Sequence, residues 1–287
     1  MADEEYQIAD TKGRFTKAVK DGRKLNNISW SEGRILLSNR RLILVGGEGK
    51  QTISLSDIDG LSGRADATQS LAAMSNYLSL RIDEDVLVVS AQDHEEFELA
   101  FFKAMLDERV VMAKHPAVEG GVVQGTSWEK ARLTVEPESL MATLQSGSLV
   151  DLELDEISGL DTEKRTVNGD KQRVIEVAHA DGSTSVETHL TGPSQVCVFV
   201  KAYLDQGAQQ SETNLDLDPS EEEVLMALHS GVSPFSIPEF IDRDVDEIEE
   251  TFERFLELDL VDEVRQRREV QLNSRGRNIA SEAMGEQ

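Results

Sequence analysis

Cysteine and long apolar runs are scarce in this sequence, and each shortage excludes a class of protein. Cys197 is the sole cysteine of the 287 residues, so no disulfide can form within the chain. No window approaches the roughly 18 apolar residues that a membrane-spanning helix needs. The first ten residues, MADEEYQIAD, are acidic and lack the apolar core of a secretory signal. We therefore expect a cytoplasmic protein without direct membrane insertion.

Cations are also in short supply. The chain has 29 Lys and Arg against 55 Asp and Glu, which gives a formal net charge of −26 and a pI near 4.5. Such an excess of one sign suits a protein that must stay soluble where salt screens its charges. The composition favours a halophilic archaeal origin, with an ordinary acidic cytosolic protein as the alternative.

Recognisable catalytic motifs are missing too. The string GGEGKQT at 46–52 lacks the spacing of a phosphate-binding loop and precedes a predicted strand, so we interpret it as a hairpin turn. The histidines show no metal-like spacing, and they are His94, His115, His179, His189 and His229. The sequence therefore predicts no catalytic residues, no metal site and no cofactor.

The chain repeats itself. Trp30 corresponds to Trp128, and each tryptophan stands equally far from the last leucine of its copy, Leu106 or Leu204. Matched positions between these ends keep their size and polarity; they are Ile35 with Leu133, Leu37 with Val135, Leu42 with Leu140, and Gly49 with Gly147. Agreement at both ends and in the middle predicts an internal duplication.

Each copy has the same predicted order of elements. Alternating apolar residues indicate early strands, glycines indicate a turn, and YLSLRIDEDVLVVSA and RVIEVAHADGSTSVETHL indicate hairpins. A helix ends each copy, the first capped by Asp93 with Glu96 as its capping-box partner and the second opened by Pro193 and Ser194. The predicted buried faces of these helices contain Phe97, Phe101, Ala104 and Met105 in the first copy, and Val196, Phe199, Val200 and Tyr203 in the second. The fold class is thus α+β, with two tandem β-barrel domains that are similar to PH-like and GRAM-like domains, each closed by its own helix.

The C-terminal segment has a different pattern. Residues 207–218 are polar and predict a linker, and residues 219–287 predict three helices followed by a strand, a turn, a strand and a last helix. We expect Ser220 to cap the first of these helices with Glu223 completing a capping box. The third is expected to face inward with Val245, Ile248, Phe252, Phe255 and Leu256. This order resembles a winged helix-turn-helix. The predicted domains are therefore 1–112, 113–206, the linker 207–218, and 219–287.

The motifs together resemble a known family. The stretch GRFTKAVKDGRKL, followed by W-x-x-GRILLSNRRLILVGGEGKQTISLSDIDGL, is similar to the N-terminal half of the archaeal CheF taxis proteins, haloarchaeal branch. The similarity extends through both repeats into the C-terminal segment. It implies a non-enzymatic chemotaxis adaptor that binds the phosphorylated response regulator CheY and the switch-complex proteins of the archaellum, at the inner face of that motor. It also implies a homodimer, with CheY engaged near the C-terminal end.

The contacts with CheY and with the motor can each be assigned to residues on physical grounds. Arginine beside aliphatic side chains suits a protein interface, so CheY is assigned to a set in the C-terminal segment: Leu258, Leu260, Arg265, Arg267, Arg268 and Met284. The alternative is that these residues serve only solubility and the core. The motor contact is assigned to the cations of the first copy: Lys12, Arg14, Lys17, Lys20, Arg23, Lys24, Arg40 and Arg41. Two alternatives are that these cations balance nearby acids, or that they meet an anionic membrane surface.

The rival function is a transcription regulator whose tail binds DNA, with the repeats as sensor and dimer modules. DNA binding needs several cationic contacts to phosphate. Residues 219–287 hold 18 acids and 7 arginines, and the would-be recognition helix is strongly acidic. The charge pattern therefore favours a winged helix that docks proteins and binds no nucleic acid.

Overall fold

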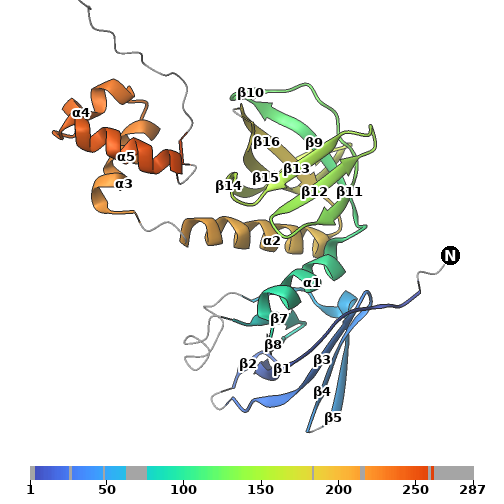
Figure 1. Cartoon of the computed structure of the whole chain (residues 1–287). Coiled ribbons are helices and arrows are strands. Elements are labelled where there is room, and N and C mark those ends of the chain that lie inside the picture. Colours follow the sequence, from blue (N-terminus) through green and yellow to red (C-terminus); the bar gives the residue numbers. More distant parts are fainter. Residues whose placement is uncertain are drawn as a thin grey trace, which may run out of the picture. The chain divides into compact units, whose positions relative to one another are not determined.

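The computed structural model describes residues 4–25, 28–47, 49–62, 76–182, 184–213, 217–257 and 260–261 (Figure 1). The chain divides into two compact units, Met1–Asn214 and Leu215–Gln287. In the described residues, the first unit has two curled antiparallel sheets and two α-helices, and the second has helices, which confirms the α+β class. No helix within the described ranges is long and apolar enough to cross a membrane.

The first sheet has eight strands in the order β5-β4-β3-β1-β8-β7-β6, with β2 paired to β1. Its strands are β1 (Gln7–Lys20), β2 (Arg23–Lys24), β3 (Ser31–Ser38), β4 (Arg41–Gly46), β5 (Gly49–Ser54), β6 (Gly60–Leu61), β7 (Leu78–Ile82) and β8 (Asp85–Ala91). The turn η1 (Leu55–Asp57) lies between β5 and β6. Helix α1 (His94–Leu106) follows β8.

The second sheet repeats this plan strand for strand, in the order β13-β12-β11-β9-β16-β15-β14 with β10 paired to β9. Its strands are β9 (Val110–Glu119), β10 (Val122–Val123), β11 (Glu129–Val135), β12 (Ser139–Leu144), β13 (Leu149–Glu153), β14 (Ile157–Val167), β15 (Asp170–Asp181) and β16 (Thr184–Thr191). Helix α2 (Ser194–Thr213) follows. The predicted duplication is confirmed by this identical topology.

The repeat is longer than the sequence comparison indicated. Strand β1 precedes Trp30 and pairs with both β3 and β8, so the cation-rich stretch before Trp30 is a central strand of its sheet. Strand β9 holds the same place in the second sheet and runs across residue 112, where the sequence analysis placed a domain boundary. Helix α2 continues to Thr213, so the first part of the predicted linker is helical.

The two sheets share one hydrophobic core, whereas the sequence predicted two barrels that are each closed by their own helix. Helix α1 contacts β1, β3 and β8 of its own sheet but also β11 of the other, and α2 contacts β14 and β6 in the same crossed manner (Figure 1). The rings of Phe101 on α1 and Phe199 on α2 meet edge to face, with centroids 5.8 Å apart. Both predicted helix faces are buried in this joint core. Neither helix therefore serves only the sheet that precedes it.

Gln195 forms a polar tie between the copies. Its Nε2 donates hydrogen bonds to the carbonyl oxygens of Leu55 and Ile58, each at 2.8 Å. The motif that ends the first strand region, Asp57-Ile58-Asp59-Gly60-Leu61, makes room for α2, because a Cβ on Gly60 would lie 2.8 Å from Val198 Cγ1. This motif is therefore the place where the second helix docks on the first sheet.

We expect Gln195→Ala to lower the free energy of unfolding of the double-sheet unit by about 1–2 kcal/mol, because two carbonyl groups lose a donor in a largely buried place. Urea unfolding followed by far-UV circular dichroism measures the loss. Gln51→Ala, at an exposed position of β5, is the matched control and should have almost no effect. Equal losses from both variants would contradict the role of this tie.

The described part of the second unit contains α3 (Pro219–His229), η3 (Pro234–Ser236), α4 (Ile237–Phe240) and α5 (Val245–Glu257). Its own small core contains Val224, Ala227, Ile237, Ile248 and Phe255. The three predicted helical segments are present, while the predicted wing lies outside the described residues.

Several local predictions in the helices are wrong. Asp93 is the N-cap of α1 but makes no side-chain cap hydrogen bond, so the predicted capping box with Glu96 does not form. Helix α3 is capped by Asp218, which forms a complete box with Glu221, two residues before the predicted pair of Ser220 and Glu223. On α5, the predicted inward residues Val245 and Leu256 are exposed to 55% and 39%, whereas Ile248, Phe252 and Phe255 pack in or against the small core.

Candidate binding surfaces

The predicted cations of the first copy are spread along one long strand. Lys12, Arg14 and Lys17 lie on β1, Lys20 and Lys24 lie at the tip that joins β1 to β2, and the pair at 40–41 lies at the opposite end of β1. A strand of 14 residues is about 45 Å long at roughly 3.3 Å per residue. The structure therefore separates these residues into three groups: the tip group (Lys20, Arg23 and Lys24), the mid-strand group (Lys12, Arg14 and Lys17) and the turn group (Arg40 and Arg41).

The tip group is the most exposed. Lys20, Arg23 and Lys24 are exposed around a two-residue turn, Asp21-Gly22, whose φ angles are 49° and 72°. The equivalent tip of the second copy has the same turn geometry, with φ of 53° and 77° at Gly120-Gly121. Its side chains differ completely, because the strand positions there are Glu119, Val122 and Val123. The two copies thus present a cationic tip and an apolar tip on one backbone.

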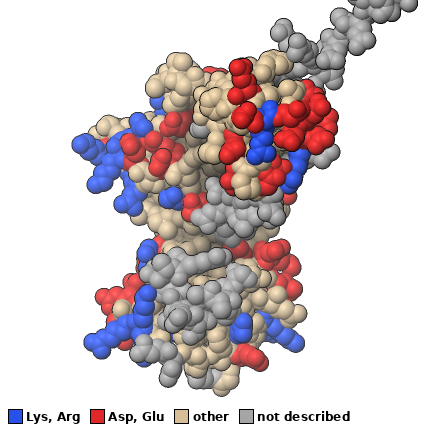
Figure 2. Space-filling view, turned by 90° about the vertical axis from the view of Figure 1, so that its left-hand side faces the viewer, with Lys and Arg blue, Asp and Glu red and all other residues tan. Residues whose placement is uncertain are grey.

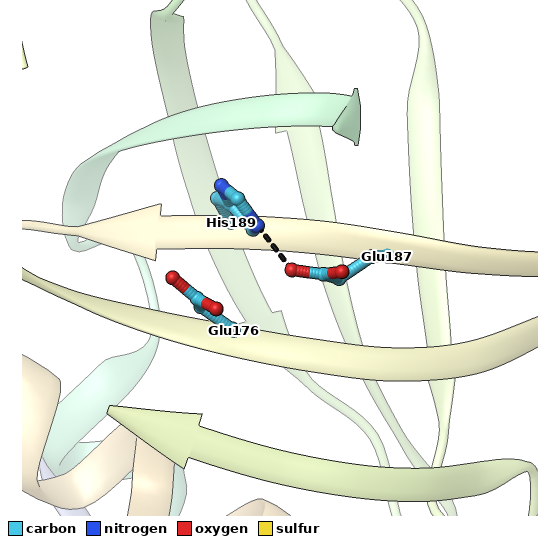
Figure 3. A group of neighbouring side chains, drawn as sticks. All are labelled: Glu176, Glu187 and His189. Atoms are coloured by element: carbon cyan, nitrogen blue, oxygen red, sulfur yellow. Dashed lines mark hydrogen bonds and ion pairs between the residues drawn. The ribbon is translucent and has the colours of Figure 1, made fainter. Parts of the chain in front are cut away.

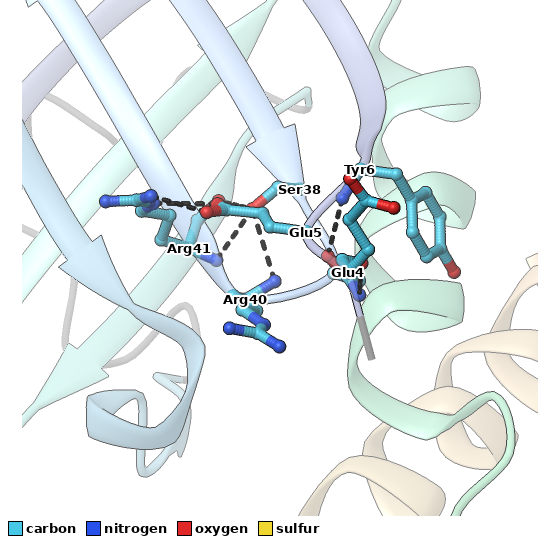
Figure 4. Close-up of polar contacts among 7 residues, drawn as sticks. Glu4, Glu5, Tyr6, Ser38, Arg40 and Arg41 are labelled. Atoms are coloured by element: carbon cyan, nitrogen blue, oxygen red, sulfur yellow. Dashed lines mark hydrogen bonds and ion pairs between the residues drawn. The ribbon is translucent and has the colours of Figure 1, made fainter. Parts of the chain in front are cut away.

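The turn group is bound to the N-terminal residues (Figure 4). Arg41 forms an ion pair with Glu5, and the hydroxyl of Ser38 donates to the same carboxylate at 2.7 Å. These contacts lower the pKa of Glu5 to about 2. The amide of Tyr6 donates to Asn39 Oδ1 at 3.1 Å. Arg41 therefore fastens the first strand to the β3–β4 turn, as the alternative of locally balanced cations predicts.

The mid-strand group is also interspersed with acids. Arg34, the cross-strand partner of Lys12, is paired with Asp10, which lowers the pKa of that carboxyl. The Lys17 ammonium lies 2.7 Å from Asp85, and the Arg14 guanidinium lies 4.9 Å from the centroid of the Trp30 ring. In Figure 2, lysine and arginine side chains lie on two sides of the lower half of the view, which is the first copy, with acidic side chains beside them.

A polar cluster that the sequence analysis missed lies on the second sheet (Figure 3). Glu187 and His189 lie two residues apart on β16, so they share a face, and Glu176 is the cross-strand partner of His189 on β15. Ligand atoms of all three lie within 4.8 Å of one another. The alternation Glu-x-His in a predicted strand was the available signal, but its partner Glu176 could only be identified once the hairpin register was known.

The second unit exposes large apolar side chains on an acidic background. Exposed fractions are 76% for Phe235 and 64% for Phe240. Helix α5 exposes Asp246, Glu247, Glu249, Glu250 and Glu253. This acidic surface does not favour the DNA-binding alternative.

Of the residues assigned to CheY, the structure describes only Leu260. Its amide donates to the carbonyl of Phe255 at 2.8 Å, and its side chain packs against the small core of the second unit. Leu258, Arg265, Arg267, Arg268 and Met284 lie outside the described residues.

Both the N-terminal and the C-terminal parts of the chain match known protein families. Residues 7–210 match the family described as Archaeal Chemotaxis signal transduction system protein F, and residues 216–285 match a domain family of unknown function, DUF8579. Taxis protein CheF1 of Halobacterium salinarum is 46% identical over 290 residues, covering 100% of both chains. Taxis protein CheF2 of the same organism is 25% identical over 164 residues, which are 55% of this chain and 56% of that protein.

Proposed function

This chain belongs to the family of the archaeal chemotaxis signal transduction system protein F, and from this premise we propose that it is a non-enzymatic adaptor. In this proposal it binds the phosphorylated response regulator CheY and couples it to the switch complex of the archaellum motor. The observation that carries the proposal is the division into two compact units with separate cores. An adaptor needs two surfaces that can be occupied at the same time, and two independent units supply them.

The C-terminal unit is the proposed CheY-binding part. Large aromatic side chains at the surface are typical anchors of protein interfaces, and Phe235 and Phe240 are of this kind. The acidic surroundings would exclude partners of like charge and favour a particular orientation. The residues Leu258, Arg265, Arg267, Arg268 and Met284 remain part of the proposed contact, while Leu260 is assigned to the core.

The motor contact is proposed for the tip group, Lys20, Arg23 and Lys24. The tip of the first copy is exposed and cationic, and the equivalent tip of the second copy has Glu119, Val122 and Val123 instead. Phosphorylation would shift CheY toward the state with higher affinity for the C-terminal unit. Binding would then raise the concentration of that state beside the motor. Homodimer formation and a place at the inner face of the motor are part of the same proposal.

A pull-down tests this function directly. The full chain is the bait for CheY with and without beryllofluoride as phosphoryl mimic, and for the archaellum switch proteins. We expect more CheY with the mimic, and simultaneous capture of the switch proteins. Capture that is indifferent to the mimic would refute the relay. Binding of duplex DNA at native salt, or flotation with anionic vesicles, would support the two alternative partners instead.

Charge reversal at the tip should weaken the motor contact. We expect the double variant Lys20→Glu/Arg23→Glu to reduce capture of the switch proteins at least tenfold, because close like charges replace complementary ones. CheY binding should not change. The control Lys130→Glu/Lys171→Glu makes the same net charge change at exposed positions of the second copy and should retain capture. Equal capture by both double variants would show that the tip is not the contact.

A further inference from the structure

The charged cluster on the second sheet takes the place of uncharged residues, two valines and a serine, in the first sheet. On the second sheet Ile175 pairs with Leu190, and next to this pair Glu176 pairs with His189. On the first sheet the corresponding pairs are Leu78 with Val89, and Ser79 with Val88. By the same registers, Val86 of the first sheet occupies the position that corresponds to Glu187 of the second. One backbone therefore carries Ser79, Val86 and Val88 in one copy, and Glu176, Glu187 and His189 in the other.

A tryptophan at equivalent positions of the two copies lies beside each set. Val86 and Val88 are buried beside Trp30 in a small apolar cluster of the first sheet. His189 lies beside Trp128, the duplicate of Trp30, with ring centroids 6.2 Å apart. The first copy thus folds with two valines and a serine at these positions, so the backbone does not itself require charged side chains there. Partly buried charges are costly unless they are paired or bind a metal, and here His189 Nε2 contacts Glu187 while Glu176 pairs with Arg165. A metal ion would give the imidazole and both carboxylates one common partner.

We propose that Glu176, Glu187 and His189 form a binding site for a divalent transition-metal ion such as Zn²⁺. Two carboxylates and one imidazole are a donor set that Zn²⁺ uses, whereas Ca²⁺ and Mg²⁺ prefer oxygen ligands alone. The side chains are sheltered, with exposed fractions of 12% for Glu176, 26% for Glu187 and 7% for His189. The two carboxylates balance the charge of the ion. His189 and Glu187 also line a pocket of about 400 Å³ that offers an entry path.

Arg165 orients one of these ligands. Its guanidinium forms a two-pronged ion pair with Glu176, one hydrogen bond being 2.9 Å long, and lowers the pKa of that carboxyl. Each carboxylate oxygen has a second acceptor position, so the pair leaves lone pairs of Glu176 for a metal. Hydrogen bonds of this kind commonly fix metal ligands in place.

The other histidines whose side chains are described have different neighbours. His115 Nδ1 and His179 Nε2 share the hydroxyl of Thr188, at 2.7 and 2.9 Å, and burial lowers the pKa of His115. His94 lies 3.7 Å from Glu98 on α1, without a second carboxylate in the same group. Among the described residues, His189 is therefore the one imidazole gathered with two carboxylates.

Calorimetric titration of the full chain with ZnCl₂, in a buffer without chelators, tests the site. We expect one Zn²⁺ per chain, and quenching of tryptophan fluorescence by Co²⁺ at the same site, because Trp128 lies beside His189. His189→Val and Glu187→Val introduce the side chains that the first copy carries, and each should raise the Kd for Zn²⁺ at least tenfold. Glu187→Gln keeps the side-chain shape and should weaken binding in the same direction.

His94→Gln is the matched control, since it removes an imidazole beside a single carboxylate, and Zn²⁺ affinity should not change. Far-UV circular dichroism checks that every variant is folded. The proposal is overturned if the native chain takes up no Zn²⁺, because the cluster is then a balanced group of charges only. It is equally overturned if His94→Gln loses the ion and His189→Val keeps it. Neither result bears on CheY binding, so the adaptor proposal is tested separately.

Discussion

A chain that ends at Thr213 is expected to lose all measurable affinity for phosphorylated CheY while its double sheet stays folded. Among the described side chains of α2, the last that belong to the shared core are Tyr203 and Leu204, and the truncated chain keeps the whole of α2. The C-terminal unit has its own core and is removed as a whole. Binding should therefore be lost without a general loss of structure.

Calorimetric titration with beryllofluoride-activated CheY measures this loss, and thermal unfolding of the truncated chain verifies its fold. Capture of the archaellum switch proteins by the same truncated chain is the internal control, since the proposed motor contact lies on the first copy. If CheY bound the truncated chain as tightly as the full one, its site would have to lie on the sheets.

Phe199→Ala should destabilise the double-sheet unit by about 3–5 kcal/mol, the usual cost of emptying a fully buried phenylalanine site. Phe199 is 0% exposed and meets Phe101 of the other copy edge to face. For a unit of this size the melting temperature should fall by about 6–20 °C. The loss is large because the cavity opens where both sheets depend on the same helices.

Differential scanning calorimetry of the full chain measures the effect on the transition of the double-sheet unit. Phe240→Ala is the matched control, because the same substitution at a position that is 64% exposed should change stability by less than about 1 kcal/mol. A separate transition for each sheet in the Phe199→Ala chain would support two independent cores and contradict the shared one.

The duplication and its buried faces could be predicted from the sequence, because hydrophobic periodicity is a local property. Ile35, Leu37, Leu133 and Val135 are all fully buried, as their alternation indicated. Both helix faces and both hairpins were found for the same reason. Strand β1 was missed because its cations mask the alternation; they lie on exposed or half-exposed positions while Thr16 and Ala18 are buried.

Contacts between segments that are far apart in the sequence could not be predicted. The contact of α1 with β11 and the bonds from Gln195 to the first copy depend on how the copies pack, and no periodicity encodes this. The cluster of Glu176, Glu187 and His189 depends on the pairing register of β15 and β16. Charge counting found the cations of the first copy, but not that Arg41 and Lys17 are held by Glu5 and Asp85.

The crossed packing of the two helices also bears on the origin of the chain. Either copy alone would expose the apolar surface of its helix that the other copy now covers. A single-copy ancestor could hide that surface by pairing with an identical molecule, as symmetric two-chain assemblies do. Fusion of the two genes would then have freed each half to change its outward side chains independently. The equivalent tip positions, Arg23 in one half and Val122 in the other, both face solvent and differ in the way that such a divergence would produce.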